Sequence, residues 1–163
     1  HENFGIVPDV AAIAKALGGG FPIGACLATA DAAQGMTAGS HGSTFGGNPL
    51  GVTAANAVLD IMLAPGFFEH IESMHQYLIA GIEGIARRYQ GVIGEVRGLG
   101  LLIGMRCVGN NTDLVDALRD RNLLAVPAGD NVVRFLPPLI IEERHVDEAL
   151  EKLGDACMEL AKQ

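Results

Sequence analysis

The sequence is short of positive charge, and this shortage excludes one large class of partner. Its 163 residues carry 11 basic and 19 acidic side chains, which gives a formal net charge of −8 at pH 7. A nucleic-acid-binding surface needs a dense array of basic side chains to neutralise phosphates. We therefore expect no nucleic-acid partner.

Long hydrophobic runs are also missing. Hydrophobic residues make up 49% of the chain and the mean hydropathy is +0.30, so there is enough apolar material for a core and disorder is not expected. The apolar stretches are nevertheless interrupted by Gly, Pro, Asn56 and Asp60 well before the ~20 residues that a membrane-spanning helix requires. We expect no membrane span.

Cysteine is scarce and widely spaced. Cys26, Cys107 and Cys157 form no C-x-x-C pair, and the histidines show no metal-ligand spacing. We expect no metal, no zinc site and no disulfide framework, and a reducing, cytoplasmic location.

The chain also lacks an initiator methionine and a signal peptide. It starts in loop-like sequence, from His1 to Gly5, with no charged and apolar leader behind it. We expect it to be a fragment of a longer polypeptide.

The pattern of apolar residues predicts an α/β fold in two parts. In the first part we expect a helix over residues 10–17 after Pro8-Asp9, a strand over 23–28, and a helix with Asn48 as its N-cap and Pro49 first. A helix with one apolar face follows from about Phe68 to Tyr89. These residues, 1–90, are assigned to the end of a larger domain with its connecting helix.

After Gly91 the pattern changes. Strands are expected at residues 92–97, 99–108, 123–126 and 132–136, and helices at 114–121 and from about Glu142. This alternation predicts a small C-terminal α+β domain over residues 91–163.

Lys15 is the first candidate for chemistry, because no other lysine precedes Lys152. Its neighbours are alanine, isoleucine and leucine. Loss of hydration in such surroundings favours the neutral amine that attacks a carbonyl. The alternative is a lysine whose stem lies on an apolar surface while its ammonium stays in water.

The second candidate is the loop from His41 to Pro49, which holds Ser43, Thr44 and two glycines before a helix. Hydroxyls at a helix N-terminus can bind an anion, because backbone N–H groups and the helix dipole both favour negative charge there. The alternative is an ordinary helix entry with glycines in tight turns.

Arg134 is the third candidate, as a lone arginine in an apolar strand that is followed by Pro137 and Pro138. Its guanidinium could bind a substrate carboxylate through two parallel hydrogen bonds. A structural salt bridge to an acidic side chain is equally credible at this point.

The glycines from Gly98 to Gly104 are superficially like a dinucleotide-binding fingerprint. Their spacing is wrong by one residue, and they lie inside a strand-like run rather than between a strand and a helix. We reject a dinucleotide site here.

Four segments, in the right order, resemble motifs of the class III pyridoxal-phosphate aminotransferases. They are Pro8-Asp9 with Ala14-Lys15 and residues 18–25, residues 41–50, residues 96–101, and residues 134–139. Together they cover nearly the whole chain. The second and fourth are most similar to the acetylornithine branch of the family.

This resemblance implies a fold and a chemistry. The fold would be the C-terminal part of a fold type I transferase, and Lys15 would form the Schiff base with pyridoxal phosphate and then shuttle a proton. Ser43 and Thr44 would bind the cofactor, Thr44 contacting its phosphate from the neighbouring subunit of a homodimer. Arg134 would bind the α-carboxylate of the amino-acid substrate.

The implied reaction transfers an amino group between N2-acetylornithine and 2-oxoglutarate in arginine biosynthesis. The family's aspartate for the pyridine nitrogen, its aromatic stacking residue and its main phosphate loop would all lie upstream of His1, so this chain alone is expected to be inactive. Alternatives are a succinylornithine, ornithine or 4-aminobutyrate aminotransferase, an aminomutase, or a non-catalytic module that keeps the fold.

Overall fold

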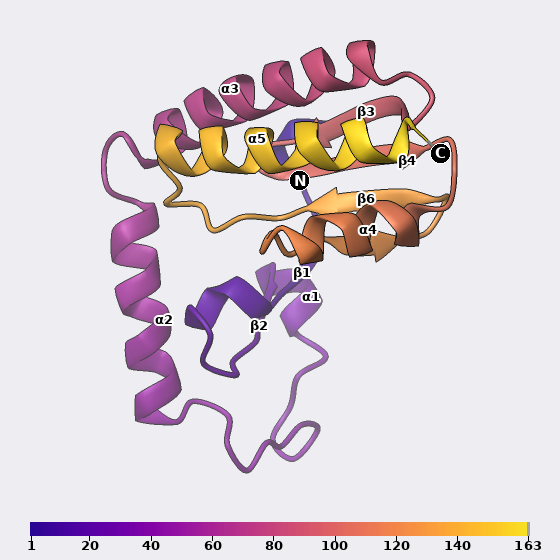
Figure 1. Ribbon diagram of the computed structural model, residues 1–163. Helices are drawn as coiled ribbons and strands as arrows, with labels where there is room; N and C mark the ends of the chain where they lie inside the picture. The colour runs from indigo at the N-terminus through magenta and orange to yellow at the C-terminus, as the bar shows by residue number, and fades with distance from the viewer. Residues whose placement is uncertain (163) are drawn as a thin grey trace. The chain divides into compact units, whose positions relative to one another are not determined.

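A computed structural model describes residues 1–162, which form two compact units. The first unit is His1–Phe67 and the second begins at Phe68; each is described here by itself (Figure 1). The long helix expected to connect two domains therefore belongs to the second unit of this chain. The assignment of residues 1–90 and 91–163 to two domains of a whole enzyme stays a prediction.

The first unit combines a small sheet with helices. In chain order its elements are η1 (Glu2–Phe4), β1 (Val10–Ile13), η2 (Lys15–Gly18), β2 (Ala25–Ala28), α1 (Ala30–Ala33) and α2 (Pro49–Met62), where η marks a 3-10 helix. Strands β1 and β2 pair in antiparallel fashion, with Val10 opposite Ala28 and Ile13 opposite Ala25.

The helix expected over residues 10–17 is wrong. Residues 10–13 form β1 instead, because they pair with β2, and this pairing overrides the helix preference of the alanines. Ala14 is extended, with φ −160° and ψ −160°, and Lys15 has φ +57°. Neither conformation can continue a right-handed helix.

The start of α2 is confirmed as expected. The Asn48 side-chain oxygen accepts a hydrogen bond from the Gly51 N–H at 2.8 Å, and Pro49 occupies the first turn. An asparagine cap followed by proline satisfies the otherwise unpaired N–H groups of a helix start.

The second unit is an α+β layer structure. In chain order its elements are α3 (Phe67–Arg88), β3 (Ile93–Leu99), β4 (Leu102–Cys107), α4 (Asn111–Asp120), β5 (Val126–Ala128), β6 (Val132–Phe135) and α5 (Glu143–Leu160). The strand order is β3-β4-β6-β5, and all neighbours are antiparallel. Helices α3 and α5 run side by side in Figure 1.

The core lies on one face of this sheet. Side chains of β4 and β6 that point to this face, including Ile103, Met105 and Val133, are fully buried and share one cluster with residues of α3, α4 and α5. The apolar face expected for α3 is confirmed, because Met74 and Ile82 are buried in the same cluster. The other face of the sheet carries exposed residues and is called the open face below.

The cysteines of the described residues are free thiols. Burial raises the pKa of Cys107 to about 11 and the pKa of Cys157 to about 12, so both remain protonated near neutral pH and act as small apolar side chains. In residues 1–162, no group of three or more His, Cys, Asp or Glu side chains is placed to hold a metal.

Among the described helices, none is by itself both long and apolar enough to cross a membrane, although α2 and α3 taken together as a bent pair would pass on length and composition.

Candidate active site

Lys15 lies at the junction of β1 and η2 in the first unit. Its backbone is left-handed, with φ +57°, a conformation that costs a non-glycine residue roughly 1–2 kcal/mol. The side chain is exposed, and so are Ala14 and Ala16 beside it. Within the described residues Lys15 is thus exposed, as in the alternative in which its ammonium stays in water.

Glycines next to Lys15 allow the turn to pack against α2. A Cβ on Gly18 would stand 2.7 Å from Ile23 Cγ2, and one on Gly19 would stand 2.9 Å from Val58 Cγ2. Gly19 also has φ +58°. A side chain at Gly19 would push the Lys15 turn away from α2, and one at Gly18 would crowd Ile23 in the loop that follows η2.

Ser43 and Thr44 lie in a tight loop immediately before α2. The loop is closed by hydrogen bonds from Gly46 N to Ser43 O, at 3.4 Å, and from Asn48 Nδ2 to Phe45 O, at 2.9 Å. A Cβ on Gly46 would stand 2.9 Å from Ser43 Cβ. Thr44 is exposed and its hydroxyl makes no hydrogen bond within residues 1–162. The loop thus offers free hydroxyl groups at a helix N-terminus.

Arg134 lies in the second unit, on the open face of the sheet. The register places it directly opposite Gly104 of β4 on one side and Val126 of β5 on the other. Directly opposed residues of antiparallel strands point to the same face. Because neither neighbour carries a polar side chain, neither can pair with the guanidinium.

The guanidinium of Arg134 has an unused donor. Its Nε atom is buried and has no hydrogen-bond partner, and no ion pair involves this arginine in the part of the chain that the structure describes. The structural salt bridge that the sequence left open is therefore not formed within residues 1–162. A buried N–H without a partner is costly unless a ligand pairs with it.

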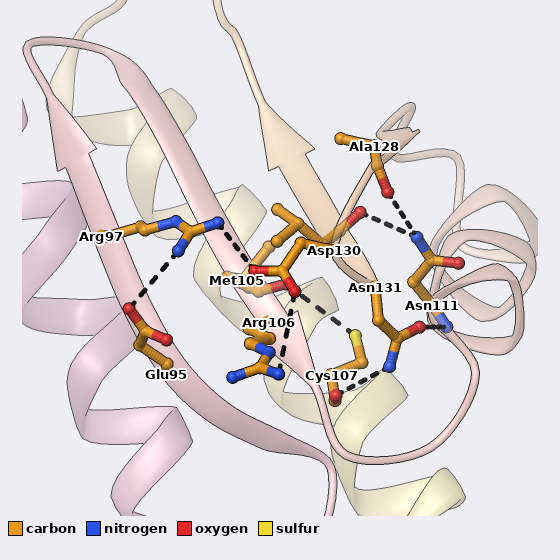
Figure 2. A network of polar contacts seen from close by, with 10 residues as sticks. Glu95, Arg97, Met105, Arg106, Cys107, Asn111, Ala128, Asp130 and Asn131 are labelled. Carbon is orange, nitrogen blue, oxygen red and sulfur yellow. Dashed lines mark hydrogen bonds and ion pairs between the residues drawn. The ribbon is translucent and has the colours of Figure 1, made fainter.

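Glu95 and Asp130 are engaged by two other arginines of this unit. Arg97 binds Asp130 at 3.2 Å and Glu95 at 3.7 Å, and Arg106 binds the same Asp130 at 3.7 Å. Figure 2 shows both guanidinium groups converging on Asp130. These pairs hold the carboxylates while Arg134 stays unpaired, which favours a site for an external carboxylate.

Two asparagines, Asn131 after Asp130 and Asn111 at the start of α4, were not singled out from the sequence. The side chain of Asn131 joins β6 to the end of β4, and the side chain of Asn111 joins β5 to β6 (Figure 2). We call Asn111 and Asn131 the asparagine clasp. The one signal in the sequence is the Asp130-Asn131 pair, which is typical of a turn with positive φ, but it does not reveal the partners.

The glycine-rich segment from Gly98 to Gly104 forms a hairpin between β3 and β4, with Gly100 at φ +52° in its turn. A dinucleotide fingerprint requires a strand, a turn and a helix. These glycines lie in a hairpin and not between a strand and a helix.

The four predicted site residues are distributed over both units. Lys15, Ser43 and Thr44 belong to the first unit, and Arg134 belongs to the second. Within the first unit, η2 and α2 pack together, so the Lys15 turn and the Ser43-Thr44 loop share one helix as support.

The sequence of this chain is similar to those of known proteins. The sequence profile of the family described as class-III aminotransferases matches residues 1–157. Acetylornithine aminotransferase 1 of Bradyrhizobium diazoefficiens is 59% identical over 157 residues, which are 96% of this chain and 39% of that protein. The chain thus spans about two fifths of the length of such relatives.

Solved structures agree in fold. The crystal structure of acetylornithine aminotransferase from Elizabethkingia anophelis matches with a TM-score of 0.88 and 32% identity, over 97% of this chain and 41% of that one. The ornithine aminotransferase of Toxoplasma gondii, reported with partial occupancy of pyridoxal phosphate at its active site, matches with a TM-score of 0.87 and 28% identity, over 96% of this chain and 39% of that one.

The expected fold, the C-terminal part of a pyridoxal-phosphate-dependent transferase of fold type I, is therefore confirmed. The matched residues include the lysine in its glycine-bounded turn, the hydroxyl groups before α2 and the unpaired arginine of β6. The chain belongs to the class-III aminotransferases.

Proposed function

We propose that the whole protein is a pyridoxal-phosphate-dependent aminotransferase that moves an amino group between N2-acetylornithine and 2-oxoglutarate. The observation that carries the proposal is Lys15, which is held with its amine exposed in a strained, left-handed turn. Strain of this kind persists where the surrounding structure enforces it, often at functional sites. The relatives named above supply the choice of acetylornithine.

The residues of the first unit fit the cofactor. Lys15 offers a primary amine for the cofactor's aldehyde, and Ser43 and Thr44 offer hydroxyl groups at the start of α2 for its phosphate. When bound, pyridoxal phosphate supplies the electron sink that stabilises negative charge on the substrate Cα.

The chain's own residues would then act in sequence. Arg134 binds the substrate α-carboxylate with its fork of N–H donors, including the Nε that is unpaired here. This contact fixes the orientation of the Cα–H bond. The Lys15 amine would act as the base that takes the proton from the substrate Cα and later gives it up again.

The proposal includes a homodimer, in which Thr44 contacts the phosphate bound by the neighbouring subunit. Exposed Thr44 and exposed Phe45, which is 81% accessible, support a contact surface at this loop. A cytoplasmic place in arginine biosynthesis follows from the acetylornithine substrate, and we propose it on that basis.

Amino transfer by the full-length protein tests this proposal. The purified holoenzyme is mixed with 2-oxoglutarate and, in separate reactions, with N-acetylornithine, succinylornithine, ornithine or 4-aminobutyrate, and glutamate release is followed. We expect the highest kcat/KM with N-acetylornithine. A preference for another donor would reassign the substrate within the family, and turnover with none of the four would contradict the proposal.

A further inference from the structure

Arg134 lies on β6, between β4 and the short edge strand β5, and side chains reinforce the turn that joins β5 to β6. Strand β5 has three residues and, among the strands of residues 1–162, pairs only with β6. The loop that joins the two strands holds Asp130 and Asn131, both with left-handed φ, +58° and +56°. The β5–β6 ladder has three residue pairs, so few ladder hydrogen bonds hold the edge strand β5 against β6.

Asn131 ties the start of β6 to the end of β4. Its Nδ2 donates to Cys107 O at 2.8 Å and to Gly109 O at 2.6 Å. Its own backbone carbonyl accepts from Cys107 N at 2.9 Å. Three hydrogen bonds therefore join this one residue to β4 and the loop behind it, as Figure 2 shows in part.

Asn111 completes the link from α4. Its Nδ2 donates to Ala128 O of β5 at 3.2 Å and to Val132 O of β6 at 2.9 Å, while its backbone N–H donates to Asn131 Oδ1 at 2.9 Å. Ala128 and Val132 are the pair of the β5–β6 ladder that lies nearest to the turn between the two strands. The asparagine clasp thus holds β4, β5, β6 and α4 at one point.

Arg134 stands two residues beyond Val132 and points to the same face of the sheet. Since its side chain makes no hydrogen bond or ion pair within residues 1–162, its place is set by the position of β6. Two parallel hydrogen bonds to a carboxylate tolerate only small displacements of the guanidinium.

We propose that Asn111 and Asn131 are positioning residues for Arg134, and that through it they set the affinity for the α-carboxylate of both substrates. The proposal rests on the proposed function, because it takes Arg134 as the carboxylate-binding residue. The clasp itself touches no substrate.

The test uses the full-length holoenzyme with Asn131→Gly and Asn111→Ala. Glycine adopts the left-handed backbone of residue 131 without strain, so this variant removes only the side chain. Asn110→Ala is the matched control, since Asn110 caps the same helix through Thr112 N at 3.2 Å but belongs to no clasp contact. KM for amino donor and for 2-oxoglutarate should both rise about tenfold in the clasp variants, with kcat changed less than twofold.

A double variant separates positioning from mere stability. Combined with Arg134→Lys, which already lacks the fork, Asn131→Gly should raise KM by less than twofold further, because its effect passes through the guanidinium. If Asn131→Gly raised KM by the same factor with Arg134 present and with Arg134→Lys, the proposal would be overturned. The proposal would also be overturned if the clasp variants left both KM values unchanged and lowered the melting temperature only as much as Asn110→Ala.

The same experiment distinguishes this proposal from the proposed function. If Arg134→Lys alone leaves both KM values unchanged, the role of Arg134 in carboxylate binding fails and the positioning role fails with it. If Arg134→Lys raises both KM values but the clasp variants do not, the proposed function stands and only the positioning role is overturned.

Discussion

Lys15 combines a reactive side chain with an uncommon backbone. Its φ of +57° lies in a region that glycine and asparagine normally occupy. The sequence could single out Lys15 as an isolated lysine, but it could not predict this turn, because the turn depends on the pairing of β1 with β2 and on Gly19 against Val58 of α2.

Thr44 is the residue to test for phosphate binding. Thr44→Ala in the full-length protein should weaken cofactor retention by about 1.5–3 kcal/mol, the range for a hydrogen bond to a charged group. Equilibrium dialysis of the cofactor from both proteins measures the change. Thr37→Ala, at another exposed threonine of the same unit, is the control, and equal retention by Thr44→Ala and the parent protein would contradict the role.

Arg134 should act on both half-reactions, because both amino donors carry an α-carboxylate. Arg134→Lys keeps the charge but loses the fork, so kcat/KM should fall roughly tenfold or more in each half-reaction, as expected for the loss of a charge-assisted hydrogen bond. Stopped-flow half-reactions with glutamate and with N-acetylornithine measure it. Arg88→Lys, at an exposed position on α3, should change neither. Damage to one half-reaction alone would indicate recognition of a particular side chain instead.

Whole elements were more predictable than single contacts. The apolar spacing predicted one buried face for α3, and Leu78 on that face lies in the core. The clasp could not be predicted, because Asn131 bonds to backbone carbonyls of Cys107 and Gly109. Backbone groups carry no signature in the sequence, so such contacts appear only once the strands are placed.

The packing of α3 on α5 gives a prediction at the scale of the helix. A Cβ on Gly81 would overlap the side chain of Leu150, and overpacking of this kind costs about 1–3 kcal/mol. Gly81→Ala should therefore lower the free energy of unfolding, measured by urea denaturation.

Gly84→Ala on the same helix is the matched control. Its Cβ would meet nothing closer than Arg87 Nη2, at 3.9 Å, and alanine has a higher helix propensity than glycine by roughly 1 kcal/mol. This variant should be neutral or stabilising. If both variants changed stability equally, the contact between Gly81 and Leu150 would not limit the packing of the two helices.

At the scale of the whole molecule, the first unit exposes large apolar side chains. Phe4, Val7 and Leu63 are 75%, 90% and 75% accessible. Apolar surface in such amounts normally marks a contact with other protein. These residues span about two fifths of the length of the relatives they match, and we expect further cofactor contacts in the part that they do not span.

Residues 1–163 alone should therefore neither retain pyridoxal phosphate tightly nor catalyse amino transfer, and they should self-associate in solution. Light scattering after size-exclusion chromatography measures the association, and glutamate release measures the activity. A monodisperse monomer with a turnover of ~1 s⁻¹ or more, as in ordinary enzymes, would show that the chain is sufficient by itself.

The identity of the cofactor-binding lysine tests the proposed function most directly. Full-length holoenzyme is reduced with borohydride and digested, and the pyridoxyl group is located by mass spectrometry. Within these 163 residues the competing lysines are Lys152 and Lys162, both far along the chain from the Lys15 turn. We predict a pyridoxyl group on Lys15. In Lys15→Ala we predict that both the pyridoxyl group and amino transfer are lost. A pyridoxyl group on any other lysine, with Lys15 unmodified, would contradict the role of Lys15.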